Sequence, residues 1–270
     1  MPRPAFVETR DGHLLAYRDE GNGSPVVFIH GWSLSGAIWQ PQLDYLVANG
    51  HRVIVYDRRG HGHSAKPPTG YDYDTLSDDL AAILTHTGVT GATLVGHSMA
   101  SGEIARYFAR HGGRHVARTF FVAPTTPFAL KTSDNPEGTD RAAFDQLVAA
   151  LEADTKQYLT AGAPSLVGPD ATPETLKWAL DMAFQADPAA LVKCVRAFTE
   201  TDFRANLRTI KVPTLVVYGT ADLPMIARNA YRTSAAIAGS RLDAYEGAPH
   251  GLFITDRERF NADLLRFARS

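Results

Sequence analysis

Four short runs of mostly apolar residues constrain the fold of this chain more than any other feature of its sequence. They are Pro25 to Gly31, Arg52 to Asp57, Ala92 to Gly96 and Pro213 to Gly219. Continuous apolar runs of this length are typical of strands buried on both faces of a parallel sheet. Three segments have apolar residues at helical spacing. Residues 39–49 lie between the first and second runs, residues 76–84 between the second and third, and residues 99–110 directly after the third. Strand and helix therefore alternate, which predicts the α/β class, with a mostly parallel sheet flanked by helices.

The sheet is expected to begin with antiparallel strands. Residues 5–8 and 13–18 flank Asp11-Gly12, a dipeptide that favours a tight turn between two strands. A further strand is expected over 116–122. The pattern thus predicts a hairpin ahead of the parallel strands.

The alternation of strands and helices has one long interruption. From 124 to 211 the sequence has helix-like stretches and no strand, with connectors expected at 135–138 and 161–164. We therefore expect one α/β core, residues 1–123 and 212–270, with a helical cap inserted in it, residues 124–211.

Length and composition exclude several classes of protein. The 270 residues carry 27 Lys and Arg against 29 Asp and Glu, a formal net charge of −2, and no basic run that could neutralise nucleic-acid phosphates. No run of about 18 apolar residues could span a membrane, and the N-terminus lacks the apolar segment of a signal peptide. Cys194 is the single cysteine, which excludes an intrachain disulfide. We expect a cytoplasmic protein with no nucleic-acid or membrane partner.

The pentapeptide Gly96-His97-Ser98-Met99-Ala100 follows the third apolar run and leads directly into a predicted helix. A serine at a sharp strand-to-helix turn is held at the edge of the sheet, where its hydroxyl can act as a nucleophile. Small residues on either side let strand and helix cross closely. The last position of the usual G-x-S-x-G pattern is Ala100 here. The alternative is that Ser98 only caps the helix.

A serine nucleophile needs a histidine base and an acid that orients the histidine. In a doubly wound sheet both come from loops at the carboxyl ends of later strands. Asp222 follows the run 213–219, and His250 follows a strand expected over 241–246. Taken alone, each could be an ordinary loop residue. The chain order Ser98, Asp222, His250 is the order expected of a serine hydrolase on this kind of sheet, and it predicts a catalytic triad.

Acyl transfer also needs N–H donors aimed at the oxygen that becomes negative. The backbone N–H of Met99, at the start of a predicted helix, is the first candidate. The second is the N–H of Trp32, because Gly31 permits a close approach of that loop. Trp32 and Met99 are therefore the predicted oxyanion hole.

The predicted cap contains five large apolar side chains that we expect to line a compact pocket for short acyl or aryl groups. They are Phe128, Phe144, Trp178, Met182 and Phe184.

Three other features have structural interpretations. His61 and His63 have the spacing of metal ligands, but the sequence places no third ligand beside them. Residues 21–23, Gly-Asn-Gly, lack the three-glycine spacing of a dinucleotide fingerprint. Cys194 lies on an apolar helical face and is expected to be a packed thiol. We therefore expect no metal and no cofactor.

Five motifs distributed along the chain can be considered together. They are His30-Gly31-Trp32, Tyr56 to Ser64, Gly96-His97-Ser98-Met99, Ala197 to Arg204 and Ala248-Pro249-His250-Gly251. The combination resembles the α/β-hydrolase fold and, more narrowly, the cofactor-free haloperoxidase and aryl-esterase family. The likeness spans nearly the whole chain, the cap included.

The resemblance implies a serine hydrolase of small carboxylic esters, with Trp32 and Met99 as the oxyanion residues and with a homotrimer or homohexamer as the assembly. Members of the family often carry Pro after the tryptophan, where this chain has Ser33. This departure argues against the perhydrolase and halogenating side activities of the family, because they depend on the shape of this loop.

The expected function is serine carboxylic-ester hydrolysis through an acyl-enzyme, with a small-molecule ester as the partner. The same triad could instead serve a lactonase, a lactamase-type amidase, or a perhydrolase and cofactor-free haloperoxidase. A non-enzymatic alternative is a ligand receptor that reuses the fold without turnover. The complete triad argues against a receptor, because binding alone needs no base and no orienting acid.

Overall fold

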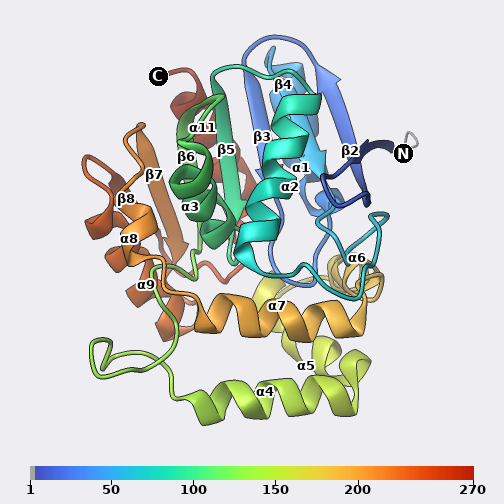
Figure 1. Cartoon of the computed structure of the whole chain (residues 1–270), viewed down its shortest axis with the longest axis vertical. Coiled ribbons are helices and arrows are strands. Elements are labelled where there is room, and N and C mark those ends of the chain that lie inside the picture. Colours follow the sequence, from blue (N-terminus) through green and yellow to red (C-terminus); the bar gives the residue numbers. More distant parts are fainter. Residues whose placement is uncertain (1–3) are drawn as a thin grey trace.

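An eight-stranded sheet forms the centre of the computed structural model, which describes residues 4–270 (Figure 1). The order of the strands across the sheet is β1-β2-β4-β3-β5-β6-β7-β8. Their bounds are β1 Ala5–Glu8, β2 Leu14–Gly21, β3 Pro25–Ile29, β4 Arg52–Tyr56, β5 Ala92–His97, β6 Val116–Val122, β7 Thr214–Gly219 and β8 Arg241–Tyr245.

The strand directions follow the sequence pattern. Strands β1 and β2 form the predicted antiparallel hairpin, and β2 pairs antiparallel with β4. The six strands from β4 to β8 across the sheet are parallel. The carboxyl ends of these strands therefore meet at one edge of the sheet, and the loops that follow them lie next to one another.

Helices cover both faces of the sheet, which explains the continuous apolar runs. Val27, Ile54 and other strand residues pack on one face against α2, α3 and α9, whereas Val26, Val53 and their neighbours pack on the other face against α1, α10 and α11. The bounds of these helices are α1 Gln40–Ala48, α2 Tyr73–His86, α3 Ala100–His111, α9 Pro224–Ala236, α10 Leu252–Thr255 and α11 Arg257–Ala268, with a 3₁₀ turn η1, Gly36–Trp39, before α1. None of the helices in residues 4–270 combines the length and hydropathy that a bilayer-spanning segment requires.

Between β6 and β7 the chain forms five helices, of which α4 to α7 lie beyond one end of the sheet, at the bottom of Figure 1, whereas α8 lies beside the sheet near α9. We refer to residues 124–211 as the cap. Its helices are α4 Arg141–Ala153, α5 Thr155–Val167, α6 Pro173–Ala183, α7 Pro188–Glu200 and α8 Arg204–Leu207. The expected connector at 161–164 was wrong, because these residues lie inside α5 with Pro164 near its end.

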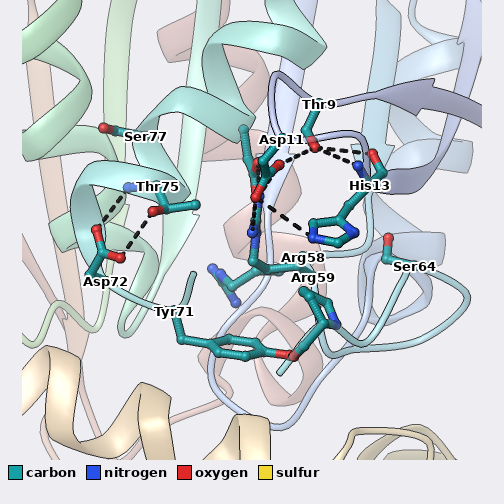
Figure 2. Close-up of polar contacts among 12 residues, drawn as sticks. Thr9, Asp11, His13, Arg58, Arg59, Ser64, Tyr71, Asp72, Thr75 and Ser77 are labelled. Carbon is teal, nitrogen blue, oxygen red and sulfur yellow. Dashed lines mark hydrogen bonds and ion pairs between the residues drawn. The ribbon is translucent and has the colours of Figure 1, made fainter. Parts of the chain in front are cut away.

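The loop after β4 is held in place by buried ion pairs. Figure 2 shows Arg59 below Asp11 of the β1–β2 turn, and the guanidinium of Arg59 donates hydrogen bonds of 2.9 and 3.1 Å to the Asp11 carboxylate. The same guanidinium donates two hydrogen bonds of 2.6 Å to the carboxylate of Asp79 in α2. Asp57, at the start of the same loop, accepts a hydrogen bond of 2.7 Å from Gly36 N–H. The hairpin, α2 and the loop after β3 are therefore fixed relative to one another.

Candidate active site

Ser98 lies in the sharp turn between β5 and α3, as the sequence predicts. Its φ is +56°, in the left-handed region that non-glycine residues rarely adopt. The turn is held because Ser98 N–H donates to Val122 O at 2.8 Å and Ser101 Oγ donates to Ser98 O at 2.7 Å. A Cβ at Gly96 would lie 2.6 Å from Ile104 Cδ1 and 3.3 Å from Ala100 Cβ of α3, so glycine at this position lets strand and helix cross closely. Ala100 is fully buried in this crossing, which accommodates its methyl group.

Asp222 and His250 come from the loops after β7 and β8, two neighbouring strands. His250 Nδ1 lies 2.6 Å from Asp222 Oδ2, and the Asp222 side chain is only 1% exposed. The other carboxylate oxygen accepts a hydrogen bond of 2.6 Å from Leu223 N–H. An ionised carboxylate can only accept, so His250 carries its proton on Nδ1 and keeps the lone pair of Nε2 free.

Ser98 and His250 line the same cavity, although no hydrogen bond joins their side chains within residues 4–270. His97, the neighbour of Ser98, connects the two loops. Its ring lies 4.6 Å from the His250 ring between centroids, and its Nε2–H donates to His250 O at 3.2 Å. Burial, together with the nearby His250, holds the pKa of His97 well below its usual range, so this ring stays neutral. Hydrogen bonds of catalytic groups are often long in unliganded enzymes and shorten when substrate binds.

The predicted oxyanion residues border the same turn. The backbone N–H groups of Trp32 and Met99 donate no hydrogen bond to any residue of the described chain. A methyl group on Gly31 would lie 2.5 Å from His97 Nδ1 and 3.4 Å from Ser98 Cβ, so only glycine lets the loop approach Ser98 this closely. The Trp32 loop and the start of α3, which both lie next to Ser98, therefore each carry one backbone N–H without an acceptor in the described chain.

A buried network that sequence reasoning missed supports the Trp32 loop. His30 Nε2 accepts a hydrogen bond of 2.9 Å from Arg58 N–H, and Nδ1–H donates to Gly31 O at 2.7 Å. Arg58 also donates to His30 O at 2.8 Å, and its guanidinium pairs with Glu103 of α3 at 2.9 Å. Burial lowers the pKa of His30 far below its usual range, so it remains neutral. The only sequence signal for this role is the position of His30 directly before Gly31.

A cavity of about 300 Å³ lies between Ser98 and the cap. The wall formed by α4 to α7 consists of Phe144, Leu147, Tyr158, Leu159, Gly162, Ala163, Ser165, Leu166, Ala179, Leu180, Ala183 and Phe198. The core contributes Trp32, Ser33, Leu34, His97, Asp222, Leu223, Met225 and Ile226, and Thr125 lines the cavity from the first residues of the cap. Within the described residues, no lysine or arginine lines the cavity. The site is an apolar chamber with its polar groups concentrated at Ser98 and His250.

Of the five cap side chains expected in the pocket, only Phe144 lines it. Trp178 and Met182 pack with the core cluster beneath α1 and α11 instead. Phe128 is buried below the Arg204 guanidinium, and Phe184 is 39% exposed next to Lys156. The expectation was wrong for these four because helical periodicity identifies an apolar face without saying which neighbour it meets.

A sequence profile of the alpha/beta hydrolase fold matches residues 24–257. The chain belongs to the α/β-hydrolase family. A non-heme chloroperoxidase of Kitasatospora aureofaciens, CPO-A1, is 38% identical over 96% of this chain and 97% of its own. A bifunctional esterase/perhydrolase of Acinetobacter calcoaceticus, DCH, is 36% identical over 98% and 99%. The crystal structure of a bromoperoxidase from Bacillus anthracis superposes with a TM-score of 0.94, at 35% identity over 99% and 100% of the two chains.

The resemblance drawn from the motifs is thereby confirmed for this α/β hydrolase. The loop that contains Trp32 nevertheless has an individual feature. Ser33 adopts φ +62°, and a proline, which is fixed near −65°, cannot take this conformation. The loop backbone at this position is therefore incompatible with the proline that the family often carries.

The two histidines with metal-ligand spacing lie in different environments of this α/β hydrolase. His61 is fully buried, and its Nδ1 bonds to Arg59 O at 3.0 Å. The side chain of His63 is 68% exposed and lies 3.4 Å from Asp57. Cys194 is fully buried, and burial raises the pKa of its thiol to about 12, so it is a protonated packing residue.

Proposed function

We propose that this α/β hydrolase cleaves small, uncharged carboxylic esters through an acyl-enzyme formed on Ser98. The observation that carries the proposal is the pair of a buried Asp222 carboxylate and His250, joined at 2.6 Å, beside a strained serine at the floor of an apolar cavity. A perturbed backbone and an oriented imidazole at one cavity are the combination that nucleophilic catalysis requires.

In the proposed mechanism Ser98 Oγ attacks the ester carbonyl while His250 Nε2 takes its proton. The carbonyl oxygen becomes negative and accepts hydrogen bonds from Trp32 N–H and Met99 N–H, the two donors without a protein acceptor in the described chain. Asp222 keeps the His250 tautomer and stabilises the imidazolium. The leaving alcohol then takes the proton from His250, and water, activated by the same histidine, hydrolyses the acyl-enzyme.

The apolar composition of the cavity wall favours substrates with an uncharged acyl group. A carboxylate in the acyl chain would have to leave water for an apolar wall without a cationic partner, which is strongly unfavourable. A volume of about 300 Å³ lies at the lower end of the range for small-molecule sites, which favours short acyl or aryl groups.

The experiment is a comparison of wild type with Ser98→Ala in two assays. A fluorophosphonate probe should label the wild-type protein at Ser98 and leave the variant unlabelled, whereas a receptor without turnover would not be labelled. Hydrolysis of p-nitrophenyl acetate should fall by at least about 1,000-fold in the variant, whose cavity is otherwise unchanged. Failure of the folded wild type to label would exclude the proposal.

A panel at equal concentration separates ester hydrolysis from its alternatives. We expect p-nitrophenyl acetate and butyrate to be cleaved faster than lactones or lactams, and a monoester of a dicarboxylic acid to be disfavoured. A lactone preference of about 100-fold, which corresponds to about 2.7 kcal/mol in the barrier, would replace the esterase assignment.

Perhydrolysis is the second candidate, because the Acinetobacter relative is named a bifunctional esterase/perhydrolase. It is tested by adding hydrogen peroxide to the ester reaction and measuring peracid. The positive φ of Ser33 gives this chain a different oxyanion loop from a proline-containing one, so we expect hydrolysis to dominate.

A further inference from the structure

We propose that the cap is a fixed part of the catalytic machinery, and that Gly251 is a positioning residue through which helix α5 holds His250 in place. The inference rests on the proposed role of His250 as the base. Two loops are involved, the base loop, residues 246–251, and the oxyanion loop, residues 30–35. Each is anchored to the cap by a separate contact.

The first anchor joins the base loop to the last turn of α5. His250 N–H donates to Ser165 O at 3.3 Å, and Gly251 N–H donates to Leu166 O at 2.8 Å. The last carbonyls of a helix have no partner within the helix, so the base loop supplies donors that α5 otherwise lacks. On the side of the core, His97 donates a hydrogen bond to His250 O. The backbone of His250 is therefore held by both the core and the cap.

Glycine at position 251 is required by this contact and not by its own backbone conformation. Its φ is −94°, which any residue can adopt. A methyl group at this position would overlap the Leu166 carbonyl oxygen and would also come within 3.2 Å of the Ile254 side chain. Backbone oxygen in a helix cannot move aside as a side chain can, so the close approach of α5 depends on the missing Cβ.

The second anchor joins the oxyanion loop to α7. The indole N–H of Trp32 donates to Leu191 O at 3.0 Å, and Leu191 is fully buried. The Trp32 ring also packs edge-on against Tyr158 of α5, with 6.3 Å between centroids. A cap that swung away as a flap would break both anchors and release the backbone of both loops.

Hydrogen–deuterium exchange of the free protein tests the fixed cap without any turnover, so its result is separate from that of the proposed function. We expect the Gly251 amide to exchange on the order of 1,000-fold or more slowly than an unstructured amide, as core strand amides do, and to be unchanged after Ser98 reacts with a fluorophosphonate. Fast exchange of the Gly251 amide in the free protein, whether or not it slows after this modification, would show that the cap opens and would overturn the proposal.

Two variants test the positioning role of Gly251. Gly251→Ala is expected to lower kcat for p-nitrophenyl acetate by about 10- to 100-fold with KM changed less than about twofold, because a small displacement of the base costs catalysis and not binding. Ile254→Val alone is the matched control, and it should have wild-type activity. The double variant Gly251→Ala/Ile254→Val removes only the crowding by Ile254 Cδ1, while the Leu166 carbonyl oxygen and Leu166 Cδ1 stay in place, so it should be as slow as Gly251→Ala.

If Gly251→Ala had the wild-type kcat, or if the double variant recovered it, the close approach of position 251 to the Leu166 carbonyl oxygen would not be required, and the proposal would be refuted. A Gly251→Ala protein that does not fold leaves the exchange experiment on the wild type as the deciding measurement. If Ser98 is not labelled at all, the proposed function fails, whereas protection of the Gly251 amide still decides whether the cap is fixed.

Discussion

Replacing Glu103 by glutamine should destabilise the protein more than any surface change on the same helix. Glu103 is fully buried, accepts a hydrogen bond from Tyr56 OH and pairs with the guanidinium of Arg58, which is itself only 1% exposed. Glutamine has nearly the same volume, so the change removes the charge without leaving a cavity. It leaves the Arg58 cation buried with no opposite charge, a change that costs about 3–5 kcal/mol in comparable buried pairs.

The expected shift in melting temperature follows from the size of the chain. With about 2.1 cal/mol/K of unfolding entropy per residue, 270 residues give about 0.6 kcal/mol/K, so the melting temperature should fall by about 5–9 °C. The assay is thermal unfolding followed by circular dichroism, with urea unfolding as a second measure. Arg110→Gln is the control on the same helix, because it removes the partly exposed ion pairs of Arg110 with Asp74 and Asp78 and should cost less than about 1 kcal/mol. Equal losses in the two variants would refute the reasoning.

Three further predictions concern single side chains. Asp222→Asn should lower kcat by about three to four orders of magnitude, because an amide no longer fixes the tautomer of His250; steady-state ester hydrolysis measures this, and a loss below tenfold would contradict it. Hydrogen bonding to Arg59 holds the pKa of Asp11 below its usual range, so the Asp11 carboxylate stabilises the fold above about pH 4 and loses this effect as pH falls further. Urea unfolding of wild type and Asp11→Asn should therefore differ by about 1 kcal/mol at pH 7, and this difference should shrink steadily as the pH falls below about 4; a difference that stays constant over this range would argue against the ion pair. Cys194 should not react with Ellman's reagent at pH 8 until the protein unfolds, and rapid reaction of the native protein would show that the thiol is not buried.

Sequence reasoning located the parts of the site that depend on strand ends. Ser98, Asp222 and His250 each follow a strand, and in a parallel sheet every such loop reaches the same edge. The order of these three residues along the chain, each after a strand, was therefore enough to predict that they lie at the same edge of the sheet. The free donors at Trp32 and Met99 followed from the same geometry.

The sequence did not predict helix α5 or the wall of the cavity. Gly162 and Pro164, two helix-breaking residues close together, indicated a connector at 161–164, whereas the structure continues the helix to Val167. The last carbonyls of this helix find donors at His250 and Gly251, a tertiary contact that no local pattern contains. The prediction of the cavity-lining residues was wrong for a similar reason, because the orientation of these side chains depends on how the cap helices pack.

The contact between α5 and the base loop limits how substrate preference can diverge in proteins built like this one. If His250 is the base and is held as we propose, a cap transplanted from a relative must present a carbonyl oxygen where Leu166 now does, because the chimera otherwise loses the alignment of His250. We expect variation to be tolerated more readily on α4 and α6, whose residues line the chamber without contacting the loops of Trp32 and His250 through these anchors. Directed evolution that starts from this chain would therefore do best to diversify those two helices and to keep the last turn of α5 unchanged.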